Sequence, residues 1–71
     1  MNKAGIASAV AEARKRLGHS LEAAAREIGV SWVTVWAWEH GQEPTLHNFE
    51  KIMAYVQASK KEAQHGTTDI P

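Results

Sequence analysis

The sequence contains no cysteine, only two prolines and no long apolar run. The absence of cysteine excludes disulfide bonds and thiolate metal sites, and it suits a reducing compartment. No apolar segment approaches the roughly 20 residues that span a bilayer, and no signal peptide is visible. We therefore expect a soluble, cytoplasmic protein that makes no membrane contact.

The net charge is zero, because eight Lys and Arg residues balance eight Asp and Glu residues. DNA binding depends on cations that neutralise phosphates, so this balance argues against strong non-specific binding to nucleic acid. The cations are unevenly placed: Arg14, Lys15 and Arg16 are clustered, whereas residues 31–40 contain no Lys or Arg. A chain of 71 residues forms one small domain of marginal stability, which self-association or a bound partner would stabilise.

Residue patterns typical of enzymes are absent as well. The sequence shows no nucleophile, base and acid in a catalytic arrangement and no phosphate-binding loop, and the chain is too short for a deep pocket. Its four histidines lack metal-ligand spacing. We therefore expect a protein that is not an enzyme and uses no cofactor, metal or small-molecule substrate.

Apolar residues at helical spacing predict a first helix over residues 4–17. Spacings of four, three and four place these side chains on one face: Ile6, Val10, Ala13 and Leu17. Gly18 follows where a left-handed cap would end the helix. Ser20 is a suitable N-cap for a second helix that runs to about Ile28, and Gly29 can adopt the positive φ that ends it.

Two more helices are predicted after Gly29. Ser31 is positioned to cap a third helix that ends near His40, with Gly41 as its stop. Pro44 breaks the chain, and Thr45 can cap a fourth helix. This last helix has the strongest periodic pattern, a stripe that we expect in the core: Leu46, Phe49, Ile52, Met53 and Val56. Tyr55 falls on a flank of the fourth helix, where a dimer contact could form.

From Ala58 onward the helical pattern fades into a polar stretch. We predict a folded domain over residues 1–57, followed by a frayed helix end and a flexible tail over residues 58–71. No strand alternation is visible. The predicted fold class is all-α, a bundle of four short helices, or of five if the chain adds one more.

The segment over residues 20–41, SLEAAAREIGVSWVTVWAWEHG, has the layout of a helix-turn-helix. Small alanines at positions 23–25 allow two helices to approach closely, and Gly29 supplies the turn. All three tryptophans lie within seven positions of its second helix, about two turns at ~3.6 residues per turn, so they cannot all face one small core. Val35 and Trp38 share one face, and we expect them to point inward.

These features resemble the lambda-repressor-like, Cro-type helix-turn-helix domains over roughly residues 6–57. The matching elements are Arg14, Ser20, Ala24-Ala25, the Ile28-Gly29-Val30-Ser31 turn, Thr34-Val35, the Trp38-Glu39-x-Gly41 ending and Pro44 before an apolar helix. The resemblance implies a sequence-specific DNA-binding regulator, of the kind found in phages and mobile elements. We expect a small repressor that binds an inverted repeat in double-stranded DNA as a homodimer, with helix 31–40 in the major groove. The family pattern also implies a partly buried ion pair between Arg14 and Glu39.

The resemblance assigns base contacts to outward residues of the third helix, which are Trp32, Val33, Thr34, Trp36 and Ala37. Direct readout commonly uses Arg, Lys, Asn or Gln, and this helix has none of them. It offers apolar contact with thymine methyl groups and the N–H donors of its indoles. Phosphate contacts are expected from seven residues: Arg16, His19, Ser20, Ser31, His40, Gln42 and His47.

The composition of the third helix leaves a second interpretation open. A protein-interaction module could keep the helix-turn-helix fold and use Trp32 and Trp36 as an aromatic docking patch. The zero net charge and the lack of cations in helix 31–40 favour this alternative, whereas the intact turn, caps and family spacing favour DNA.

Overall fold

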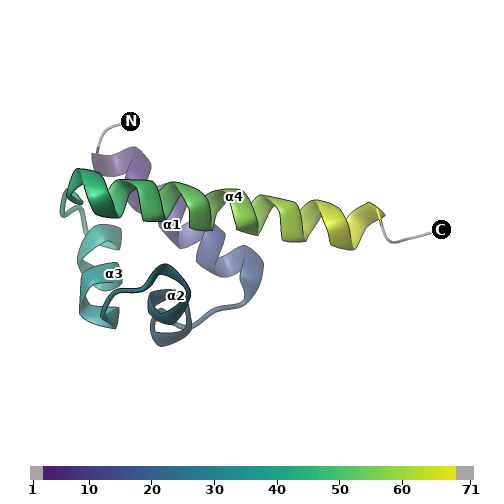
Figure 1. Ribbon diagram of the computed structural model, residues 1–71, viewed down its shortest axis with the longest axis horizontal. Helices are drawn as coiled ribbons and strands as arrows, with labels where there is room; N and C mark the ends of the chain where they lie inside the picture. Colours follow the sequence, from purple (N-terminus) through teal and green to yellow (C-terminus); the bar gives the residue numbers. More distant parts are fainter. Residues whose placement is uncertain (1–2, 69–71) are drawn as a thin grey trace.

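The computed structural model describes the backbone of residues 3–68 and the side chains of residues 5–61. Four helices follow in chain order: α1 (Lys3–Leu17), α2 (Leu21–Ile28), α3 (Trp32–Glu39) and α4 (Leu46–Thr68). Figure 1 shows the long helices α1 and α4 crossing each other, with the short helices α2 and α3 together on one side of them. The predicted all-α fold class is confirmed. Within the described part of the chain, no helix combines the length and apolar content that a bilayer crossing requires.

A small apolar core lies where the four helices meet. α1 packs against α3 and α4, and α2 packs against the same two helices. Trp38 heads the largest fully buried side chains at 1% exposure, and Val35 beside it is also buried, as the spacing predicted. The core is formed by Ile6, Val10, Ala13, Ala24, Ala25, Ile28, Val35, Trp38, Ile52, Tyr55 and Val56. Trp38 therefore fixes α3 to the rest of the molecule.

The turn between α2 and α3 depends on Gly29. Its φ is 93°, in the left-handed region that side chains with a Cβ rarely adopt. In this conformation the N–H groups of Gly29 and Val30 both donate to the carbonyl of Ala25, at 2.7 and 3.0 Å. The buried alanines at 24 and 25 let α3 approach α2 closely.

The first turns of α2 and α3 begin differently, although a serine occupies the N-cap of each. The hydroxyl of Ser20 accepts a hydrogen bond from the backbone N–H of Ala23 at 3.1 Å. Ser31 makes no side-chain cap bond, and its hydroxyl instead pairs with that of Thr34 at 3.0 Å. Ser31 therefore occupies the N-cap of α3, as predicted, but its side chain does not make the cap hydrogen bond, since a neighbouring hydroxyl competes for the same atom.

This difference predicts unequal effects of removing the two hydroxyls. We expect Ser20→Ala to lower the free energy of unfolding by about 1 kcal/mol, because α2 loses the partner of an otherwise unpaired N–H. Ser31→Ala is the matched control, and we expect a loss of only a few tenths of a kcal/mol. Urea unfolding followed by far-UV circular dichroism measures both values, and equal losses would contradict the assignment.

The buried stripe of α4 differs from the predicted one. Leu46 is 76% exposed and lies in the first turn of α4, beside an open hollow that it lines together with Ile6 of α1 and Phe49. Met53 is only partly buried, on the border of the stripe that runs through Ile52 and Val56. Tyr55 is 6% exposed and belongs to the core, so its expected place in a dimer contact is wrong.

The far end of α4 is better packed than its polar sequence indicates. Ser59 is fully buried, and its hydroxyl donates to the carbonyl of Val56 at 2.7 Å and accepts from Nη1 of Arg16 at 3.1 Å. The helix continues to Thr68, beyond the point at Ala58 where we expected fraying. The division into a domain over 1–57 and a tail over 58–71 stays a prediction, and residues 69–71 lie outside the described residues.

Candidate nucleic-acid interface

One face of α3 is apolar and open to solvent. Trp32 is 48% exposed, Val33 is 53% exposed and Trp36 is 46% exposed. We call these three residues the α3 face. They lie opposite Val35 and Trp38 because successive positions rotate by about 100° around a helix of ~3.6 residues per turn. The structure thus divides the tryptophans into one that serves the core and two that are free to contact a partner.

The remaining predicted base-contact residues are less accessible. Thr34 and Ala37 are both partly buried, at the margins of the α3 face. The paired hydroxyls of Ser31 and Thr34 place a small polar group at the N-terminal end of α3. This end of the helix therefore offers hydroxyl donors and acceptors next to the apolar surface of Trp32 and Val33.

At the other end of the α3 face, Trp36 is stacked against His40. The two ring centroids are 3.9 Å apart and the ring planes differ by 21°. Nδ1 of His40 lies 2.8 Å from the carbonyl oxygen of Trp36. His40 itself is exposed. The imidazole therefore covers part of the indole without removing it from solvent.

An ion pair joins the end of α3 to α1. Nε of Arg14 donates to Oε2 of Glu39 at 2.7 Å, and Nη2 donates to Oε1 at 2.9 Å. The third guanidinium nitrogen, Nη1, donates to the carbonyl of His19 at 3.3 Å. Hydrogen bonding to Glu39 raises the pKa of Arg14 above its usual value. Arg14 thereby fixes the C-terminal end of α3 against both α1 and the loop that precedes α2.

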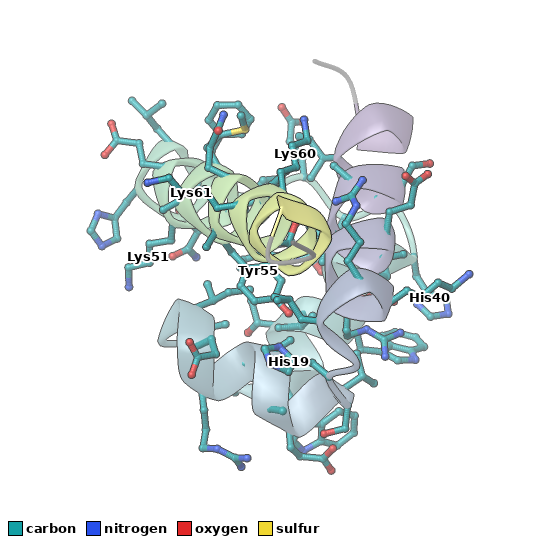
Figure 2. All side chains as sticks on the ribbon, turned by 90° about the vertical axis from the view of Figure 1, so that its right-hand side faces the viewer. His19, His40, Lys51, Tyr55, Lys60 and Lys61 are labelled. Atoms are coloured by element: carbon teal, nitrogen blue, oxygen red, sulfur yellow. The ribbon has the colours of Figure 1, made fainter. Side chains whose placement is uncertain are left out.

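His19 lies beneath α4, and Figure 2 shows its ring close to that of Tyr55. Nδ1 of His19 and the hydroxyl oxygen of Tyr55 are 2.8 Å apart, and the two rings are stacked at 5.9 Å. Burial raises the pKa of the Tyr55 hydroxyl. Since Nδ1 of His19 is engaged, only Nε2 of this ring is available for the predicted phosphate contact. Sequence reasoning did not identify the role of Tyr55, because its partner is 36 positions away.

The other predicted phosphate contacts fall into two groups. Arg16 is directed toward α4, where it bonds to Ser59, and it also lies 3.7 Å from Glu12. Ser20 caps α2 with its hydroxyl. Gln42 and His47 are exposed in and after the loop between α3 and α4. All four residues are exposed, but the side chains of Arg16 and Ser20 are engaged in hydrogen bonds within the protein, whereas Gln42 and His47 lie closer in the chain to the α3 face.

Among residues 5–61, no group of three or more His, Cys, Asp or Glu side chains could hold a metal ion. A shallow hollow of about 230 Å³ lies between α2 and α4, and it opens to solvent. Its wall combines Lys51 and Glu27 with alanines of α4, and none of its lining residues belongs to the α3 face.

Comparison with known proteins agrees with this arrangement. The family model described as helix-turn-helix matches residues 10–60, which is more than two thirds of the chain. The matched span contains all of α2 and α3 together with Arg14 and Glu39. No curated protein and no solved structure matches the chain. The chain belongs to the lambda-repressor-like helix-turn-helix family and is a DNA-binding regulator.

Proposed function

We propose that this regulator is a small repressor that binds an inverted repeat as a homodimer, with α3 of each protomer in the major groove. The observation that supports this proposal is the exposure of Trp32, Val33 and Trp36 on the helix that family members insert into DNA. The two α3 helices would then enter successive major grooves about 34 Å apart.

The chemistry of the α3 face predicts which bases it reads. Valine and tryptophan carbon atoms can contact the C5-methyl group of thymine, and each indole N–H can donate to a base acceptor. The hydroxyls of Ser31 and Thr34 add short polar contacts at the end of α3 that enters the groove. We therefore propose half-sites rich in thymine at the positions facing α3.

The electrostatic contribution to binding is proposed to be small. α3 carries no Lys or Arg, and Gln42 in the loop that follows it is exposed and uncharged. Since each neutralised phosphate contributes about 0.9 to the slope of log affinity against log salt, we expect a slope of about −3 or shallower per protomer. Specificity would then arise from apolar fit and groove shape.

Replacing Trp36 by alanine tests the DNA contact. We expect binding to a duplex selected from a random-sequence library to weaken at least tenfold, about 1.4 kcal/mol or more, because a large exposed contact is removed. The melting temperature should change little, since exposed side chains contribute little to stability. Fluorescence anisotropy of the labelled duplex measures affinity, and circular dichroism measures melting.

Leu46→Ala is the matched control, because Leu46 is the most exposed large apolar side chain of the described residues and lies outside α3. We expect this variant to bind the selected duplex as the wild type does. A Trp36→Ala variant that binds DNA normally would contradict the proposed contact, and one that loses much of its stability would place Trp36 among the residues that support the fold.

A second candidate function is favoured by the same apolar face. The α3 face contains no cation, and its two indoles could dock against an apolar surface of a protein partner. Titration of intrinsic tryptophan fluorescence with DNA at several salt concentrations separates the two functions. DNA contact should change the emission at low salt, with an affinity that falls as salt rises. The absence of any response to selected or genomic DNA would favour the protein-interaction module.

A further inference from the structure

His40 makes two contacts with Trp36 at once. Its ring lies 3.9 Å from the indole, centroid to centroid, and its Nδ1 lies 2.8 Å from the backbone carbonyl of the same residue. Two contacts with one residue restrict both dihedral angles of the imidazole. The stacked imidazole in turn restricts the rotamers of the half-exposed indole. Trp36 is therefore held in one orientation by a side chain that follows it by one helical turn.

The carbonyl contact determines which nitrogen of His40 carries hydrogen. A carbonyl oxygen can only accept, so Nδ1 must be the donor. In the neutral ring Nε2 is then a bare acceptor, and among the described residues it has no hydrogen-bond partner. A phosphate oxygen is also an acceptor, so the neutral ring cannot bond to it. Protonation adds a hydrogen to Nε2 and a positive charge to the ring, and both favour a phosphate.

The charged groups around this end of α3 leave that charge unpaired. Glu39 precedes His40 but is engaged in two hydrogen bonds with Arg14 of α1. Glu43 lies exposed in the loop that follows. The other charged residues of the two helices packed on α3 form no ion pair with His40: Glu12, Lys15 and Arg16 of α1, and Glu22, Arg26 and Glu27 of α2.

We propose that His40 positions the indole of Trp36 for contact with DNA and, when protonated, donates from Nε2 to a backbone phosphate beside it. The two rings then act as one contact unit, with an apolar part for the groove and a cationic part for its edge. A protonated ring stacked on an indole also gains a cation–π attraction. The proposal rests on the proposed function, because it takes DNA as the partner of α3.

The stacking is tested without DNA by following tryptophan emission between pH 8.0 and 5.5, the range in which histidine takes up a proton. A protonated imidazole quenches an indole in contact with it, so the wild-type emission should fall on acidification. This fall should be absent in His40→Phe and in Trp36→Phe. His47→Phe is the matched control and should keep it, because His47 is stacked on no tryptophan. An undiminished fall in His40→Phe would overturn the contact unit.

The phosphate contact is tested by affinity for the selected duplex at the two pH values. Wild type should bind about tenfold more tightly at pH 5.5, the lower end of what a hydrogen bond to a charged group contributes. Its salt slope should steepen by about 0.9, the increment for one neutralised phosphate. His40→Phe should show neither the tighter binding at pH 5.5 nor the steeper salt slope. His40→Ala removes the aromatic ring that stacks on Trp36 as well as the ring nitrogens, whereas His40→Phe keeps a ring. We therefore expect His40→Ala to bind more weakly than His40→Phe at pH 8.0.

The outcomes separate this inference from the proposed function. If DNA binds but His40→Phe keeps the full pH dependence, the phosphate contact is overturned and the proposed function stands. If His40→Ala binds as tightly as His40→Phe at pH 8.0, the positioning role is overturned. If no duplex binds at either pH, the proposed function fails together with the phosphate contact, while the emission change still reports on the stack.

Discussion

Replacing Trp38 by alanine is expected to unfold much of the protein at physiological temperature. Trp38 is 1% exposed and lies where α3 meets the core. Removing a fully buried tryptophan costs about 3–5 kcal/mol, from lost burial and the cavity that remains. A chain of this length has a total stability of roughly 4–11 kcal/mol. Urea unfolding and thermal melting by circular dichroism measure the loss, which we expect to lower the melting temperature by about 15–30 °C.

The matched control is Trp32→Ala, which removes the same side chain from the same helix. Because Trp32 is 48% exposed, we expect a loss below about 1 kcal/mol. Similar losses from the two substitutions would mean that the tryptophans do not divide into a core residue and contact residues. If Trp32→Ala keeps its stability but loses DNA binding, the loss of binding has a cause other than unfolding.

Replacing Glu39 by alanine is expected to produce the second largest loss of stability. The substitution leaves the guanidinium of Arg14 without its carboxylate partner, although Nη1 keeps its bond to the carbonyl of His19. Breaking a fully buried pair costs about 3–5 kcal/mol. The side chains here are 25% and 12% exposed, so water offsets part of this cost. We expect a decrease of about 2–3 kcal/mol in the free energy of unfolding, measured by urea denaturation.

Two further variants show where that loss originates. Glu12→Ala breaks an exposed contact with Arg16 and should cost no more than about 0.5 kcal/mol. The double variant Arg14→Met, Glu39→Leu removes both charges and should recover much of the stability lost in Glu39→Ala. Failure of the double variant to recover any stability would show that the hydrogen-bond geometry contributes more than the cost of a stranded charge.

Trp38 and Glu39 act together on the orientation of α3. Trp38 seats the helix in the core, and the pair between Glu39 and Arg14 fixes its C-terminal end to α1. Trp36 and His40 lie within two positions of them, so the rings that we propose to contact DNA are carried on the most firmly held part of α3. This arrangement presents an exposed aromatic surface from a rigid helix, which limits the entropy lost on binding.

The positions of the helices could be predicted from sequence because they depend on near neighbours. Caps, left-handed glycines and apolar spacing act over about four residues, and they indicated all four helices and the inward pair of Val35 and Trp38. The pattern was less informative for α4. It assigned Leu46 to the core, whereas this side chain is 76% exposed in the first turn of α4.

By itself, the sequence determined the helix-turn-helix and the division of α3 into two faces, because helical rotation makes each face a matter of spacing. Only the tertiary structure decided which side chains of α4 are buried and which polar groups meet across the bundle. His19 and Tyr55 are 36 positions apart, and Arg16 and Ser59 are 43 positions apart. Such pairs form because packing brings the helices together, and no local pattern records which polar groups will then face each other.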